Sequence, residues 1–184
     1  MIILASASPR RQELLKLIFD DFTVEPANID ETVRRTIELE QYPEYLALKK
    51  SRYIAEKNHF NDIVIGCDTG VFIGDIMLGK PNDEEQAREM LKLLSGKTHK
   101  VITGVSIFYK GQNISFSQVT EVEFYHLTEA DINEYIDTGE PMDKAGAYGI
   151  QGKGSLLVKR IKGDFYNVVG LPVGELKQKI KMFI

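Results

Sequence analysis

The chain opens with Ile2-Ile3-Leu4-Ala5-Ser6-Ala7-Ser8-Pro9-Arg10-Arg11, which predicts a short buried strand, a tight loop and the start of a helix. Ser8 is a natural N-cap, and Pro9 suits the first helical position because an N–H there has no helical partner to lose. Leucine and isoleucine residues continue at helical spacing to Phe19. Such a helix start presents backbone N–H groups and the positive end of the helix dipole above the strand.

The rest of the chain mixes the same two kinds of element. Apolar or alternating runs predict strands over residues 22–25, 63–67, 100–108, 114–124 and 156–161, with 100–108 and 114–124 joined as a hairpin. Amphipathic spacing predicts helices over residues 43–57, 83–94, 128–137 and 172–182, and Asn82 is expected to cap the second of these. A further hairpin turn is expected at Gly74-Asp75. With no repeat or linker in view, we expect an α/β protein with a single domain over residues 1–184.

Charge and composition limit the classes of function. Of the 184 residues, 43% are hydrophobic and 27% are charged, which is ordinary for a folded protein. The net charge is -4, so the bulk electrostatics favour neither a nucleic acid nor a membrane as partner. A polyanionic substrate therefore requires a local basic cluster that opposes the overall charge.

The compartment is predicted from cysteine content and from the amino-terminal sequence. Cys67 is the only cysteine, so no disulfide can form within the chain, and a reducing compartment is favoured. The apolar start lacks the length and the basic residues of a signal peptide. No apolar run approaches the roughly 20 residues of a membrane span. We expect a cytoplasmic protein.

Two adjacent arginines at the first strand-to-helix junction are the first candidate site. Arg10 and Arg11 are cations near a helix N-terminus, where they oppose the helix dipole, so an anion there would remove the conflict. Their planar donor groups suit phosphate oxygens. Ser6 is better assigned as a hydroxyl donor to phosphate than as a nucleophile, because no nucleophile-elbow pattern surrounds it. A solvated basic turn is the alternative.

Asp68 is the second candidate, at the end of the apolar run 63–67, where α/β folds place ligands. Its carboxylate suits a divalent metal, the activation of a water, or both; an Asx-turn is the alternative. Asp30-Glu31 would join it at a metal or form a polar loop. Lys80 is fixed between Gly79 and Pro81, which suits contact with a phosphate, although an exposed turn lysine is equally compatible.

The third candidate is the segment from Gly139 to Gly152, which is rich in glycine and contains Gln151. Such loops bring backbone donors and a side-chain amide close to a ligand. The glycine spacing does not match a dinucleotide-binding fingerprint.

Taken together, these segments resemble the Maf family of nucleoside triphosphate pyrophosphatases over nearly the whole chain. The resemblance rests on Ser6 to Arg11, Asp30-Glu31, Ala47 with Lys50, Cys67-Asp68-Thr69, Gly79-Lys80-Pro81 and residues 139–152. The run from Asp143 to Gly152 resembles the subfamily that acts on dTTP and UTP. The family implies an elongated mixed β-sheet with flanking helices, related to inosine-triphosphate pyrophosphatases, with two lobes around a central cleft. It also implies a divalent cation, Mg²⁺ or Mn²⁺, and a homodimer.

The resemblance also implies roles for individual residues. Asp68 matches the proton acceptor, and the positions linked to base specificity match Arg10, Thr69 and Gln151. The polar lining of the phosphate pocket matches Ser6, Arg11, Glu31, Lys50 and Lys80. The implied metal ligands are Glu31 and Asp68. Cys67, Gly70 and Ser51 depart from the usual family residues.

The expected reaction is attack of water on the α-phosphorus of a pyrimidine nucleoside triphosphate, which releases diphosphate. Two alternatives remain at this stage. A nucleotide-binding regulator of septum formation would use the same basic pocket without turnover. A nucleotidyltransferase would also place a basic loop after its first strand, but it would need an acceptor substrate.

Overall fold

The computed structural model describes residues 1–32 and 36–183, and its strands form a mixed sheet. The strands are β1 (Ile2–Leu4), β2 (Thr23–Val24), β3 (Ile63–Ile73), β4 (Ile76–Leu78), β5 (Thr98–Tyr109), β6 (Gln112–Phe124) and β7 (Val158–Lys162). The α-helices are α1 (Pro9–Leu15), α2 (Tyr42–Asn58), α3 (Glu84–Leu94), α4 (Glu129–Ile136), α5 (Phe165–Val169) and α6 (Val173–Ile180). Short 3-10 helices are η1 (Leu39–Gln41), η2 (Glu140–Asp143), η3 (Ala145–Ala147) and η4 (Gly152–Leu157).

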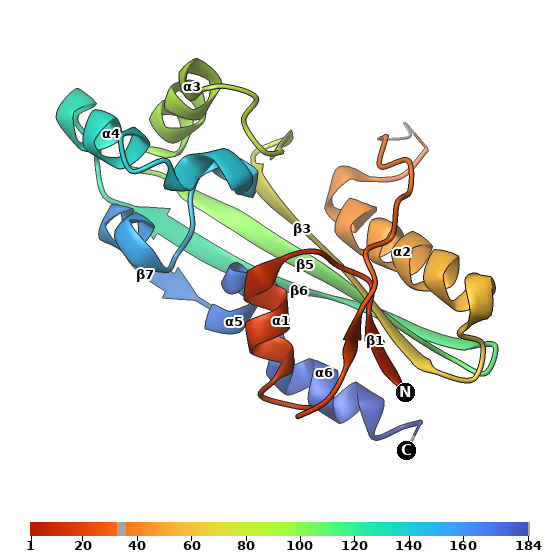
Figure 1. The fold of residues 1–184 in the computed structure, drawn as a ribbon. Helices are drawn as coiled ribbons and strands as arrows, with labels where there is room; N and C mark the ends of the chain where they lie inside the picture. The colour runs from red at the N-terminus through yellow and green to blue at the C-terminus, as the bar shows by residue number, and fades with distance from the viewer. Residues whose placement is uncertain (33–35, 184) are drawn as a thin grey trace. The chain divides into compact units, whose positions relative to one another are not determined.

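The strand order is β2-β1-β3-β5-β6-β7, with β4 beside β3 (Figure 1). β1 is parallel to both β2 and β3, whereas β4 is antiparallel to β3 and β7 is antiparallel to β6. Lys110 and Gly111 join β5 to β6 with φ values of 48° and 78°, the left-handed conformation that a tight two-residue hairpin requires. The predicted α/β class with a mixed sheet and flanking helices is confirmed.

The chain divides into two compact units. Unit 1 comprises Met1–Thr69, Thr103–Gln118 and Gly170–Ile184, and unit 2 comprises Gly70–Ile102 and Val119–Val169. Strands β3, β5 and β6 contribute residues to both units. The single domain and the central cleft stay predictions from the sequence. Across residues 1–32 and 36–183, no helix combines the length and apolarity that a membrane span requires.

In unit 1, α2 packs directly against the backbone of β3 (Figure 1). A Cβ on Gly66 would lie 2.2 Å from the carbonyl oxygen of Ala47 and 2.8 Å from the backbone nitrogen of Ser51. The Ser51 hydroxyl lies 2.8 Å from the buried hydroxyl of Ser106, so both polar groups are satisfied inside the core. Glycine at 66 thus allows α2 to approach β3 closely enough to bring its polar residues onto the strand.

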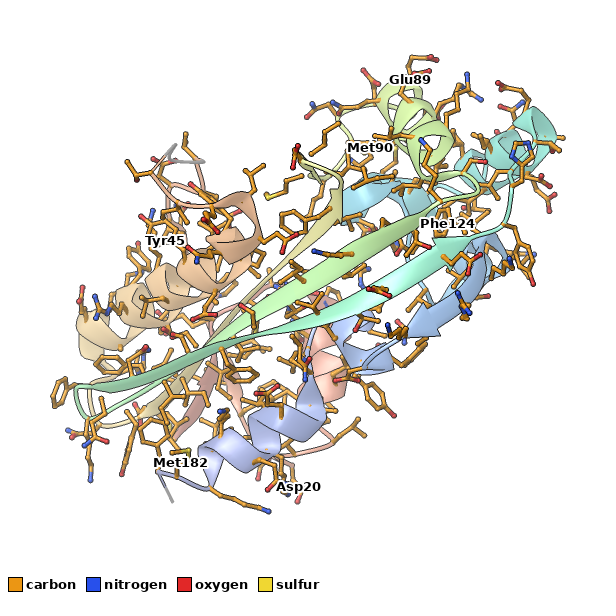
Figure 2. The ribbon with its side chains drawn as sticks, turned by 180° about the vertical axis from the view of Figure 1, so that it is seen from behind. Asp20, Tyr45, Glu89, Met90, Phe124 and Met182 are labelled. Carbon is orange, nitrogen blue, oxygen red and sulfur yellow. The ribbon has the colours of Figure 1, made fainter. Side chains whose placement is uncertain are left out.

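Unit 2 has its own apolar core, to which α3 and α4 contribute. Met90 and Leu91 of α3 are buried with Ile132 of α4 and with Phe124 of β6. Figure 2 shows Met90 directed inward and Glu89 directed away, as the amphipathic spacing of this helix requires.

Several predicted boundaries were wrong. β3 continues to Ile73 because its last residues pair with β4, so Asp68 lies inside a strand and not in a turn after it. Asn82 does not cap α3; the cap is Asp83, whose carboxylate accepts a hydrogen bond from the backbone N–H of Gln86 at 2.7 Å. α1 ends at Leu15 and α6 spans Val173–Ile180, so both are shorter than their apolar spacing suggested.

We expect Gly66→Ala to lower the free energy of unfolding by about 1–3 kcal/mol, because the new methyl group would meet the backbone of α2. Urea denaturation followed by circular dichroism measures this change. Gly174→Ala in α6 is the matched control, since its added Cβ would meet no described atom within 4 Å beyond its chain neighbours and the nearby backbone of its own helix. Equal unfolding midpoints for the two variants would contradict the close approach at Gly66.

Candidate active site

The candidate site lies in unit 1, at the carboxyl end of β1. β1 ends at Leu4, which pairs with Ile65 of β3, and the N–H of Ala5 then donates to the carbonyl of Ile65 at 2.8 Å. From this point β3 continues without β1 beside it, and the loop of Ser6 to Ser8 leads into α1. The carboxyl end of a parallel strand is where α/β proteins usually place their ligands.

Arg11, in the first turn of α1, is held entirely by neutral oxygens. Its Nη1 donates to Ser6 Oγ and to the Cys67 carbonyl, both at 3.1 Å, and its Nη2 donates to Thr69 Oγ1 at 2.9 Å. Its Nε donates to the carbonyl of Gly170 at 2.9 Å. Among the described residues these acceptors fix the guanidinium in place but do not neutralise its charge. A half-buried arginine in this state favours an anionic ligand.

Two residues that support Arg11 were not identified from the sequence. Thr103, fully buried on β5, lies 2.9 Å from Thr69 through the two hydroxyl oxygens. Gly170 has a φ of 127°, which favours glycine, and an added Cβ would lie 3.6 Å from Arg11 Nε. The glycine just before Leu171-Pro172 is a turn signal, but nothing in the sequence links either residue to Arg11.

Lys50 of α2 forms ion pairs with two carboxylates, one on β3 and one on the segment before α2. Its Nζ lies 2.7 Å from Asp68 Oδ1 and 2.8 Å from Glu31 Oε1. The side chains of Lys50 and Asp68 are 10% and 15% exposed, whereas that of Glu31 is 54% exposed. The ammonium therefore fixes Asp68 in a nearly buried position and holds Glu31 beside it from the solvent side.

These two groups of side chains border β3 from opposite faces. Successive side chains of a strand alternate, so Asp68 shares a face with Gly66, against which α2 packs, while Thr69 faces the other way toward Arg11. Both groups lie on the part of β3 that runs past the end of β1. The structure thus brings together Ser6 with Arg11 and Thr69, and separately Glu31 with Lys50 and Asp68.

Cys67, which precedes Asp68 on β3, has a structural role. Its side chain is fully buried, and burial raises the pKa of its thiol, so the thiol stays protonated at neutral pH. Its carbonyl accepts the hydrogen bond from Arg11 described above. Cys67 therefore contributes a buried side chain and a backbone acceptor.

Arg10 is half-buried in the first turn of α1, in unit 1. Lys80 and Gln151 belong to unit 2, and both are exposed. The N–H of Gly146 donates to the carbonyl of Gly79 at 3.0 Å, so the turn that carries Lys80 is tied to the glycine-rich segment that precedes Gln151.

Buried aromatic residues anchor that glycine-rich segment within unit 2. The hydroxyl of Tyr148 lies 2.7 Å from Nε2 of His99, and both rings pack edge-on against Phe124. Burial lowers the pKa of His99 to about 4, so its ring is neutral at physiological pH. The N–H of Gly149 donates to the hydroxyl of Tyr135 at 3.2 Å, and burial raises the pKa of this hydroxyl to about 12. These aromatic partners are therefore uncharged at neutral pH: His99 is a neutral imidazole, and the Tyr135 hydroxyl keeps its proton.

The donor set fits a hard divalent cation that shares its coordination with a substrate. The carboxylates of Glu31 and Asp68 lie close together because both form ion pairs with the ammonium of Lys50. Within the described ranges, no group of three or more histidine, cysteine, aspartate or glutamate side chains is arranged to hold a metal. Mg²⁺ is commonly held by one or two carboxylates together with substrate phosphates, which matches this pair.

The chain is similar to known proteins in sequence and in fold. The sequence matches the family described as Maf-like protein over residues 1–183. A protein of Bacillus mycoides (strain KBAB4) named dTTP/UTP pyrophosphatase is 49% identical over 182 residues, which cover 99% of this chain and 95% of that protein. A Bacillus cereus (strain G9842) protein of the same name is 48% identical over the same shares. The solved structure of the Staphylococcus aureus Ham1 protein has a similar fold, with a TM-score of 0.57 and 16% identity over 100% of this chain and 99% of that one. The chain belongs to the Maf family.

Proposed function

We propose that this protein is a nucleoside triphosphate pyrophosphatase that hydrolyses dTTP and UTP, and modified pyrimidine nucleotides, to the monophosphate and diphosphate. Family membership and the names of its relatives support the reaction class. The observation that carries the proposal is Arg11, a guanidinium held by four neutral oxygens, two of which belong to Cys67 and Thr69, the neighbours of Asp68 on β3. An uncompensated cation and a carboxylate thus border the same part of β3 from opposite faces, and a polyanion bound at the end of β1 would use both.

The triphosphate would lie over the carboxyl end of β1. Arg11 would donate its remaining Nη2 N–H to a phosphate oxygen, and Ser6 Oγ, which already accepts hydrogen bonds from Arg11 and from the N–H of Ser8, would donate its own proton. Arg10 in the same helical turn is a further proposed contact for the substrate, and the phosphate contact of Lys80 stays a prediction from the sequence. Fixed donors of this kind stabilise the charge that develops on the phosphoryl oxygens without reorganising during the reaction.

Asp68 is the proposed general base. Its Oδ1 is held by Lys50, which leaves Oδ2 to orient a water and accept its proton as the water oxygen attacks the α-phosphorus. The bond between the α-phosphorus and the bridging oxygen breaks, and diphosphate leaves with that oxygen. Lys50 keeps the carboxylate aimed in one direction, so positioning supplies much of the expected rate acceleration.

Glu31 and Asp68 would hold a divalent cation, Mg²⁺ or Mn²⁺, against the phosphates. When bound, the cation would neutralise part of the negative charge of the phosphates. Lys50 joins the same two carboxylates, so its ammonium would keep them together before substrate and metal arrive.

Base selection is assigned to Gln151, with Arg10 and Thr69 as further positions. A side-chain amide pairs with the polar edge of a base, and a base that leaves the amide unpaired is rejected. The homodimer and the absence of nucleic-acid and membrane partners stay predictions from the sequence, as does the cytoplasmic location.

The proposed function is tested with purified protein, Mg²⁺ or Mn²⁺, and a panel of nucleoside triphosphates, scored by released diphosphate and monophosphate. The expected result is turnover of dTTP and UTP well above that of the purine nucleotides. Binding without diphosphate release would favour the regulator without turnover. Diphosphate release that requires an acceptor would favour a nucleotidyltransferase.

We expect Asp68→Asn to lower kcat for dTTP by about a hundredfold or more, because an amide accepts no proton from water. Asparagine can still accept the hydrogen bond from Lys50, so nucleotide binding and the circular dichroism spectrum should be retained. Activity within a few fold of the wild-type value would remove Asp68 from the role of base.

We expect Arg11→Lys to raise KM for dTTP by about tenfold or more, because an ammonium cannot reproduce the fixed donor fork that contacts four acceptors. Steady-state kinetics measures the effect. Arg52→Lys, at an exposed position of α2 in the same unit, is the matched control. If both variants have the wild-type KM, Arg11 does not bind the phosphates.

We expect Gln151→Ala to change the ranking of nucleotides by kcat/KM more than it changes the highest kcat, because the amide would read the base and not the phosphates. Lys153→Ala is the control, since it alters a nearby exposed side chain in the same segment. An unchanged ranking in the Gln151 variant would refute its assignment.

A further inference from the structure

Gln151 lies in a segment of unit 2 whose backbone is held on both sides. Before it, the N–H of Gly149 donates to the Tyr135 hydroxyl at 3.2 Å. After it, the N–H groups of Lys153 and Gly154 donate to Glu140, at 3.1 Å to Oε1 and 3.3 Å to Oε2. The carboxylate of Glu140 therefore accepts two successive backbone donors just beyond Gln151.

The same carboxylate also fits closely against Gly152. Gly152 has a φ of 62°, and an added Cβ would lie 2.8 Å from Glu140 Oε1. The segment closes on itself, since a Cβ on Gly154 would lie 1.9 Å from the carbonyl oxygen of Gly149. While Glu140 keeps its position, the backbone on either side of Gln151 has little space in which to adopt another conformation.

Glu140 is itself well fixed. It begins η2, directly after Gly139, whose φ of 72° is left-handed, and directly before Pro141. Its N–H donates to Thr138 Oγ1 at 3.1 Å, and its carbonyl accepts from Lys144 Nζ at 2.6 Å. Hydrogen bonds to a carboxylate are stronger than those between neutral groups, so a fixed carboxylate is an effective support for a loop.

We infer that Glu140 is a positioning residue for base selection, which sets the backbone of residues 149–154 and through it the side-chain amide of Gln151. This inference rests on the proposed function and deepens it. Glu140 touches neither the nucleotide nor the reacting atoms in this assignment. A displacement of about 1 Å in a group that orients a substrate is enough to change a rate severalfold or more.

The experiment compares kcat and KM for dTTP, UTP, CTP and dGTP in Glu140→Ala, Glu140→Gln and wild-type protein. In Glu140→Ala we expect the kcat/KM preference for dTTP over dGTP to fall about tenfold, with kcat for dTTP within about threefold of wild type. Glu140→Gln keeps the shape and one acceptor oxygen, so its loss should be intermediate. Glu134→Ala, at an exposed acidic position of α4, is the matched control and should leave the preference unchanged.

A double-mutant cycle separates this role from a general loss of structure. If Glu140 acts through Gln151, then Glu140→Ala should change the nucleotide preference in the wild-type background but not in the Gln151→Ala background. An equal change in both backgrounds, or no change in either, overturns the inference. If Glu140→Ala does not fold, Glu140→Gln carries the same cycle. Wild-type protein that releases no diphosphate would instead refute the proposed function.

Discussion

The close contact of α2 with β3 at Gly66 is the constraint on which the site depends. A side chain at this position would collide with the backbone of α2, so glycine sets the distance between helix and strand. At this distance Lys50, which lies between the contacting residues Ala47 and Ser51, reaches Asp68, two residues further along the strand on the same face. The distance between α2 and β3 therefore determines both the packing of the core and the position of the Asp68 carboxylate.

The two cations near β3 are in different electrostatic states. Lys50 is compensated by the carboxylates of Asp68 and Glu31, whereas the partners of Arg11 in the described part of the chain are neutral oxygens. A compensated cation orients its partners, and an uncompensated one attracts an anion. This difference explains how a chain with a net charge of -4 can provide a local site for a polyanion.

In unit 2 the irregular segment from Gly139 to Gly152 is held in one conformation. It uses a buried His99–Tyr148 pair on one side and the Glu140 carboxylate on the other. The backbone takes positive φ at Gly139, Gly146 and Gly152 and also at Ala147. Ala147, Tyr148 and Ile150 of this loop are buried, and hydrogen bonds from its backbone add to that packing. The exposed Gln151 can then be presented without freedom in the chain around it.

The sequence by itself determined the α/β class, the family and most of the helices and strands, because hydrophobic period, caps and glycine-rich motifs are local signals. It also singled out Arg11, Lys50 and Asp68. It could not supply the partners of these residues, since the bond from Arg11 to Gly170 joins positions 159 residues apart. Which neutral oxygens meet a guanidinium, and which carboxylates meet an ammonium, was decided only when the strands paired and the helices packed, because hydrogen bonds depend on distances that no local pattern encodes.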